Sequence, residues 1–232
     1  MAKPNKDLSE WIDVLDVSEL MSITLGELIE TSAKKFPDTE ALVYSNQPEV
    51  EDIRWTYKDL DEMSSNLAKA FIDAGFNPGD TVGVWGPNHP EWILTEYALA
   101  KAGLRIVTLN PLYKEKELIF ALNTVAAVAI VHADVIGGVI SSDIINSIKN
   151  EIPSLRNTYT FDKGLKNLIN KGEKLNSDLP KVNPNDIFMI QYTSGTTGVP
   201  KAAQMTHQAL ITSSKNSHLR WQISANQKVC HG

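Results

Sequence analysis

Residues 187–201 read Ile-Phe-Met-Ile-Gln-Tyr-Thr-Ser-Gly-Thr-Thr-Gly-Val-Pro-Lys. The first six are mostly apolar, which is typical of a buried strand. The remainder are small or hydroxyl-bearing residues that end in one lysine. Ligands in α/β proteins bind where parallel strands end, so a glycine-containing polar loop after a buried strand indicates a ligand-binding turn in an α/β fold.

The composition of residues 193–201 suits a polyphosphate. Gly195 and Gly198 can adopt positive φ and let the backbone approach a ligand closely. Successive N–H groups in such a loop can form an anion-binding nest. Hydroxyls can donate to phosphate oxygens or ligate Mg²⁺ indirectly, and Lys201 adds a mobile charge. The hydroxyls belong to Thr193, Ser194, Thr196 and Thr197.

Two other interpretations of the loop fit less well. A Walker A loop requires Gly, four residues, then Gly-Lys and Ser or Thr. Here the two glycines are three positions apart, Pro200 precedes Lys201 and Ala202 follows it, which excludes that class. Hydroxyl-rich loops are often plain surface turns. The whole string with its lysine favours phosphate binding instead.

The stretch 193–201 matches the AMP-binding signature of the adenylate-forming superfamily at every informative position. That superfamily contains acyl-CoA synthetases, firefly-type luciferases and the adenylation domains of peptide synthetases. Further stretches are similar to acyl-CoA synthetases, and the resemblance covers roughly residues 20–215. The residues at 86–88 and 109–113 most resemble the medium-chain acyl-CoA synthetases of animal mitochondria and their bacterial relatives. The other stretches are Thr24-Leu-Gly-Glu-Leu28, Trp55-Thr-Tyr-Lys-Asp-Leu60, 79–88, Ala100-Lys-Ala-Gly103 and 110–118.

The resemblance implies a two-step reaction. A carboxylate attacks the α-phosphate of ATP to give an acyl-adenylate and pyrophosphate, and the thiol of CoA then displaces AMP. It implies ATP, Mg²⁺ and CoA as reactants or cofactors and a short- or medium-chain fatty acid as substrate. Residues 193–198 and Lys201 would grip the β- and γ-phosphates, whereas Val199 and Pro200 would set the geometry of the loop. No catalytic or metal-ligating residue and no CoA site is assigned within this chain.

Outward from the loop, strand and helix patterns alternate. Apolar runs predict strands at 81–85, 105–109, 126–132 and 158–161. Helices are predicted at 20–36, 57–74, 90–103, 114–125 and 139–150, and a hairpin joins 41–44 to 52–56. Residues 162–185 are polar and predict a surface connection. After the loop, 202–205 would pair with 187–192, and Thr206 would cap a helix over 207–219.

This alternation predicts an α/β fold with a mainly parallel βαβ sheet flanked by helices. The resemblance makes it the N-terminal part of the large domain of an adenylate-forming enzyme. We expect an N-terminal extension at 1–20 and a partial AMP-binding domain at 21–232.

Bulk properties exclude several classes of protein. The net charge of −6 disfavours a nucleic-acid binder, and the single cysteine excludes an internal disulfide. The longest apolar run, 125–131, is far too short to cross a membrane. The first ten residues contain acids and no arginine, unlike a mitochondrial transit peptide, so we expect a cytoplasmic protein. A mitochondrial location is the alternative that the resemblance implies.

Later motifs of the family, which hold Mg²⁺, the ribose and the catalytic lysine, are absent from these residues. Two hypotheses follow: an N-terminal portion of an AMP-forming acyl-CoA ligase, or a truncated, non-catalytic nucleotide-binding remnant. Aryl-CoA ligase or luciferase-like chemistry also stays open. Among other residues, we expect His207, Trp85 and Trp92 to be structural and Cys230 to be inert, while Tyr192 could either pack in the sheet or line the nucleotide site.

Overall fold

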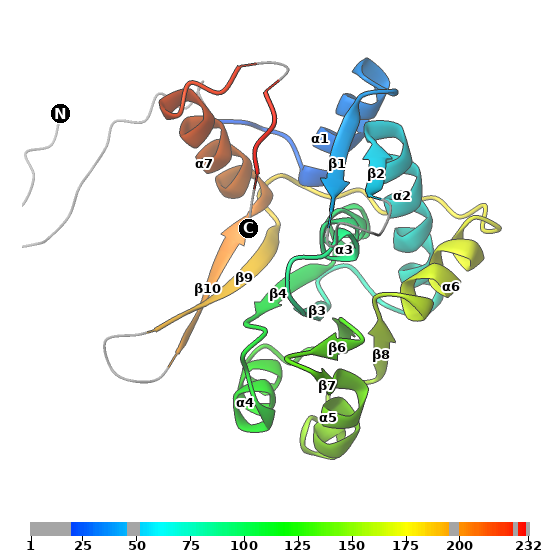
Figure 1. Ribbon diagram of the computed structural model, residues 1–232, viewed down its shortest axis with the longest axis vertical. Coiled ribbons are helices and arrows are strands. Elements are labelled where there is room, and N and C mark those ends of the chain that lie inside the picture. The colour runs from blue at the N-terminus through cyan, green and yellow to red at the C-terminus, as the bar shows by residue number, and fades with distance from the viewer. Residues whose placement is uncertain (1–19, 46–51, 195–199, 225–226, 231–232) are drawn as a thin grey trace, which may run out of the picture.

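The computed structural model describes residues 20–45, 52–194, 200–224 and 227–230. Its centre is a six-stranded sheet in the order β10-β9-β4-β3-β5-β8 (Figure 1). β9, β4, β3, β5 and β8 run parallel and β10 runs antiparallel to β9, which confirms the α/β class with a mainly parallel sheet. The strands are β3 (Thr81–Trp85), β4 (Arg105–Leu109), β5 (Ala129–His132), β8 (Asn157–Thr160), β9 (Ile187–Thr193) and β10 (Lys201–Thr206).

Helices cover both faces of this sheet (Figure 1). One group of helices packs together and consists of α1 (Leu25–Lys35), α2 (Tyr57–Asp73), α3 (Pro90–Lys101) and α6 (Lys163–Gly172). The opposite group holds α4 (Glu115–Thr124), α5 (Ser141–Ile148) and the 3-10 turn η2 (Lys149–Glu151). The last helix is α7 (His207–Arg220), which follows β10 directly. Two antiparallel hairpins complete the fold, β1 (Glu40–Tyr44) with β2 (Ile53–Thr56) and β6 (Val135–Ile136) with β7 (Val139–Ile140).

Local sequence signals explain where the helices begin and end. The side chain of Thr24 accepts from the N–H of Glu27, whose carboxylate accepts from the N–H of Thr24, so a capping box starts α1. Thr56 and Asp59 form the same arrangement at the start of α2. Gly75, two residues after α2, has φ +87°, a conformation that favours glycine.

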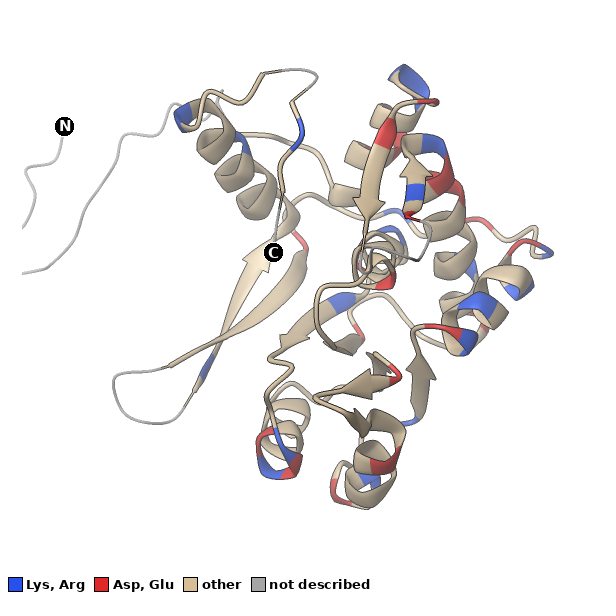
Figure 2. Ribbon diagram, in the orientation of Figure 1, with Lys and Arg blue, Asp and Glu red and all other residues tan. Residues whose placement is uncertain are grey.

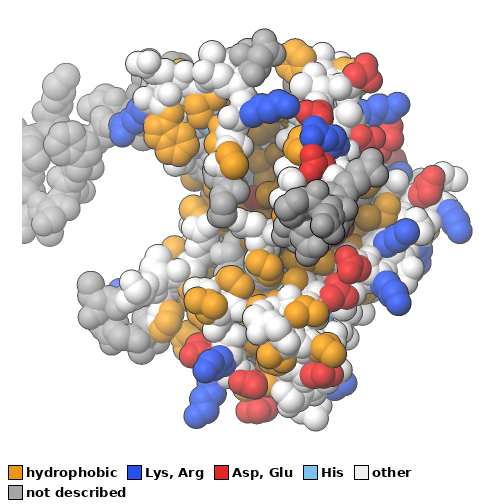
Figure 3. All heavy atoms as spheres, viewed as in Figure 1, with side chains coloured by type: hydrophobic (Ala, Val, Ile, Leu, Met, Phe, Trp, Pro, Cys, Tyr) orange, Lys and Arg blue, Asp and Glu red, His pale blue; other side chains and the backbone are white. Residues whose placement is uncertain are grey.

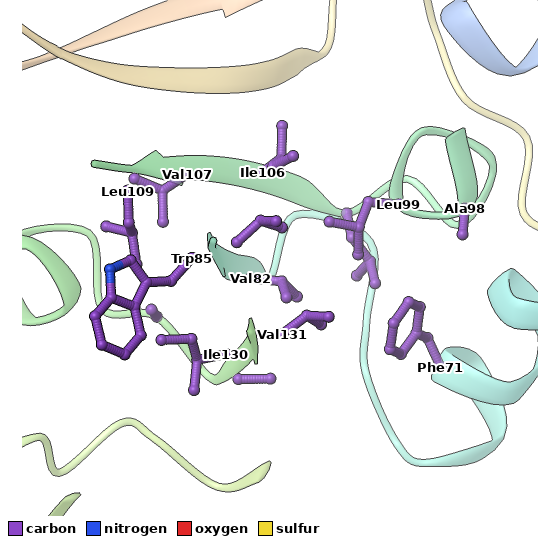
Figure 4. Close-up of a cluster of buried hydrophobic side chains, with 14 of the residues drawn as sticks. Phe71, Val82, Trp85, Ala98, Leu99, Ile106, Val107, Leu109, Ile130 and Val131 are labelled. Carbon is purple, nitrogen blue, oxygen red and sulfur yellow. The ribbon is translucent and has the colours of Figure 1, made fainter. Parts of the chain in front are cut away.

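The core lies where the central strands meet α2 and α3. Side chains from β3, β4 and β5 interdigitate with Phe71 of α2 and Leu99 of α3 (Figure 4). Trp85, the largest of them, is 1% exposed, as expected for a core aromatic. Its indole N–H donates to the carbonyl of Asn110 at 3.1 Å, so it also links the ends of β3 and β4.

A buried charge joins the helices on one face. The ammonium of Lys101 at the end of α3 lies 2.6 Å from a carboxylate oxygen of Asp61 and 2.7 Å from the hydroxyl of Ser65, both on α2. Its third proton goes to the carbonyl of Asp61 at 2.8 Å. Burial lowers the pKa of Lys101, but its three donors are satisfied, as a buried ammonium requires.

Three predictions of secondary structure were wrong. The helix predicted at 20–36 begins only at Leu25, because the capping box at Thr24 starts it there. Residues 163–172 form α6 rather than a surface connection, because Leu165 and Leu168 are buried against α2. Val139 and Ile140 are not helical but form β7, and α5 begins at Ser141. The Ser141 hydroxyl bonds to the carbonyl of Ala133 and to the buried ring of His132, which fixes this corner.

Candidate functional site

The polyphosphate loop predicted at 193–201 lies at the tip of the β9–β10 hairpin. Thr193 is the last residue of β9, and it pairs with Lys201, the first residue of β10. Ser194 and Pro200 flank these two positions, and all four residues are exposed. Gly195, Thr196, Thr197, Gly198 and Val199 lie outside the described residues.

The hairpin places these residues at the ligand-binding edge of the sheet. Because β9 is parallel to β4 and β3, Thr193 lies at the same edge as the turns that follow Leu109 and Trp85. Carboxyl ends of parallel strands form this edge, which is where α/β proteins bind ligands. Thr193 and Lys201, which flank the loop, therefore lie at the edge where α/β proteins bind ligands.

The sequence around the loop contains one charged residue. Between Asp186 and His207 the sequence contains no charged residue except Lys201. Figure 2 shows the contrast, since acidic and basic side chains are interspersed over α1, α2 and α6. The Lys201 ammonium makes no ion pair with any residue in the described ranges. It is therefore available to an anionic ligand in a chain of net negative charge.

Backbone pairing closes the base of the loop. Tyr192 pairs with Ala202 and Thr193 pairs with Lys201. The Thr193 hydroxyl donates to the carbonyl of Lys201 at 3.5 Å, a long contact that a phosphate oxygen could replace. The strands thus bring the first hydroxyl and the lysine of the predicted site together.

Tyr192, whose role the sequence left open, contacts helix α4. Its hydroxyl donates to the carbonyl of Ala121 in α4 at 2.7 Å, and its half-buried ring lies against Phe120. Burial raises the pKa of Tyr192, so the phenol stays protonated and acts as a donor. In this structure, Tyr192 packs as a strand residue.

His207 is structural, as expected. Its ring is 1% exposed and stacks on Phe188 of β9 with 4.6 Å between centroids. Its Nδ1 accepts from the N–H of Leu25 at 3.3 Å, so the ring joins the start of α7 to the start of α1. Burial lowers the pKa of His207 to about 4, and the ring is neutral at physiological pH.

A second polar group at the same edge was not anticipated from the sequence. His89, which caps α3, forms an ion pair with Glu91, and its ring stacks on Phe161 and lies against Tyr44. The pair with Glu91 raises the pKa of His89. His89 is the last residue before α3 and Glu91 lies in its first turn, so neither strand nor helix spacing predicts that the two side chains meet.

Cavities lie away from the hairpin. One of about 560 Å³ is mainly apolar and lies between β1, the start of α3, where Trp92 is one of its lining residues, and residues 228–230. A second cavity, of about 400 Å³, has several charged side chains in its lining and lies between α1, α2 and residues 179–182. We place the candidate site at the hairpin because a loop that wraps phosphates need not form a cavity without its ligand.

The described part of the chain offers no ready metal centre. No three His, Cys, Asp or Glu side chains in these ranges converge to hold an ion. The helices in the same ranges also lack the length and apolar composition of a membrane span.

Figure 3 shows a hollow between α7 and the β9–β10 hairpin, with apolar side chains on its wall.

Two of the relatives most similar to the chain are named as acyl-CoA ligases. Acyl-CoA ligase sidI of Beauveria bassiana is 31% identical over 91% of this chain and 38% of its own length. The Mus musculus protein named medium-chain acyl-CoA ligase ACSF2, mitochondrial, is 30% identical over 85% of this chain and 35% of its own length. The chain thus spans less than half of each relative.

Solved structures agree on the fold. A long-chain-fatty-acid-CoA ligase, FadD1 of Archaeoglobus fulgidus, has a TM-score of 0.77 over 88% of this chain and 40% of that one, at 24% identity. At this identity the likeness shows a shared fold. The family model for AMP-binding enzymes matches residues 29–231, most of the chain. This match shows that the chain belongs to the AMP-binding enzyme family.

Proposed function

We propose that the protein containing this chain is an AMP-forming acyl-CoA ligase that converts a fatty acid, ATP and CoA into acyl-CoA, AMP and pyrophosphate. The observation that carries the proposal is the hydroxyl-rich loop between β9 and β10 in a chain of the AMP-binding family. The relatives' names support the acid–CoA ligase class. A short- or medium-chain fatty acid is the substrate we propose, from the likeness to the medium-chain ligase.

The proposed role of the loop is electrostatic. Attack of a carboxylate on the α-phosphate spreads negative charge over phosphate oxygens and the departing pyrophosphate. Thr193, Ser194 and Lys201 would donate to the β- and γ-phosphates together with the loop residues 195–198. Val199 and Pro200 would shape the turn. Each hydrogen bond to a charged phosphate contributes about 1.5–3 kcal/mol.

The hairpin residues could take part in binding Mg²⁺ but not, in this proposal, CoA. The described hairpin residues offer hydroxyls and one ammonium but no carboxylate, so they fit Mg²⁺ only as a companion of bound ATP. Mg²⁺ would neutralise phosphate charge when bound. We assign no residue of this chain to CoA.

The test is product formation by the whole protein. Incubation with ATP, CoA and a panel of straight-chain fatty acids should release AMP and pyrophosphate in step with thioester. The variant Lys201→Ala should lower kcat/KM about 10- to 100-fold, which corresponds to the loss of one charged hydrogen bond. Lys166→Ala, on the exposed face of α6, is the matched control and should change nothing.

The panel also separates the alternatives. Turnover of aromatic acids in preference to fatty acids would indicate an aryl-CoA ligase, and oxidation with light emission would indicate luciferase-like chemistry. Absence of AMP release with every carboxylate would contradict the proposal and support a non-catalytic remnant.

A further inference from the structure

The β9–β10 hairpin leaves the sheet just before the loop. β4 pairs with β9 at Ile106–Met189, Val107–Ile190 and Thr108–Gln191, and among the described residues the register ends there. Tyr192 and Thr193 pair only with β10, the other strand of the same hairpin. Backbone pairing with β4 therefore does not hold the last two residues of β9.

Beyond the residues that pair with β4, the side chain of Tyr192 connects β9 to its neighbours. The Tyr192 hydroxyl reaches across to α4, the helix that follows β4, and donates to the carbonyl of Ala121 at 2.7 Å. The ring packs against Phe120, with 6.3 Å between the centroids. One aromatic residue thus ties the outgoing strand to the neighbouring βα unit.

The backbone carbonyl of Ala121, which accepts this bond, lies in the last turn of α4 and lacks its helical partner at Val125. The N–H of Val125 bonds to the carbonyl of Asn123 rather than to Ala121, the acceptor that helical pairing would use. The N–H of Ala127 turns back to Leu122 at 2.9 Å, and Ala126 has φ +48°. The last carbonyls of a helix need outside partners, and Tyr192 supplies one for Ala121.

We propose that Tyr192 is a positioning residue for the polyphosphate loop. By holding the end of β9 against α4, it fixes the position of Thr193 and Ser194, the first residues of the loop. This inference rests on the proposed role of the loop. Tyr192 itself does not contact phosphate, because its hydroxyl is bonded to Ala121.

The test compares Tyr192→Phe with Tyr159→Phe. The first change removes the hydroxyl and keeps the ring, so the variant should fold. Tyr159 lies on β8, at the opposite edge of the sheet, and is also half-buried. Amide hydrogen exchange at Thr193 and Lys201 and the dissociation constant of Mg·ATP would be measured for the 232-residue chain.

Tyr192→Phe should speed exchange at both amides about fivefold and weaken Mg·ATP binding by a similar factor, the effect of one lost hydrogen bond. Tyr159→Phe should leave both quantities at the wild-type value. Unchanged exchange in Tyr192→Phe would overturn the inference, as would wild-type ATP affinity with faster exchange. A wild-type chain that binds no ATP would instead refute the role of the loop, while exchange would still decide whether Tyr192 tethers β9.

Discussion

Single buried polar residues hold this fold together at points where elements of distant sequence meet. Lys101 joins α3 to α2, and His207 joins α7 to α1 and β9. The Lys101 ammonium and the His207 Nδ1 each have hydrogen-bond partners, which avoids the cost of burying an unpaired polar group. Lys101 and His207 therefore serve the stability of the fold. Lys201 is the charged residue that the hairpin offers to a ligand.

His207 should make stability depend on pH. Its pKa is about 4 in the folded chain and 6.5 ordinarily, so between these values the unfolded chain binds a proton that the folded chain does not. Stability from this residue is present above pH 6.5 and lost as pH falls towards 4. Urea unfolding at pH 7 and pH 4.5 should differ by about 2 kcal/mol because of His207.

The matched variants are His207→Gln and His218→Gln. A glutamine side chain cannot titrate, so the pH dependence of His207→Gln should be shallower than that of the wild type by about 2 kcal/mol over this interval. His218 lies exposed on the same helix, so His218→Gln is the control for the chemical change itself. A wild-type slope in His207→Gln would show that other groups carry the dependence.

At the scale of elements, strands were predicted best. The limits of β3 and β4 match the runs at 81–85 and 105–109, because strands in the middle of a parallel sheet are mainly apolar. The β9–β10 pairing and α7 were also predicted. α6 was missed because its exposed Lys and Asn residues mask the two buried leucines, whose partner α2 is distant in sequence.

Gly172 tests how α6 docks. A Cβ at this position would overlap the backbone carbonyl of Asn66 in α2, and no side-chain rotation can relieve a clash with backbone. Gly172→Ala should therefore lower the free energy of unfolding by about 2–3 kcal/mol, although alanine favours helices. Asn167→Ala, on the exposed face of α6, should not destabilise the chain; equal stability of both variants would contradict the observed packing.

At the scale of the whole molecule, the sequence motif identified the family and the loop, and the fold set the loop at the carboxyl edge of the sheet. The tether from Tyr192 to α4 and the His89–Glu91 pair could not be predicted. The tether joins two elements that the fold brings together, whereas the pair depends on the local conformation at the start of α3. Neither contact has a sequence pattern that predicts it. The phosphate-binding role of residues 193–201 and the domain limits stay predictions.

The most direct test of the central claim is a calorimetric titration of the 232-residue chain with Mg·ATP. The loop account predicts saturable binding that weakens about 10- to 100-fold in Lys201→Ala, because one charged hydrogen bond is lost. Lys166→Ala should bind as the wild type does. Equal affinity of Lys201→Ala and wild type, or no binding by the wild type, would contradict the claim that this loop grips the phosphates of ATP.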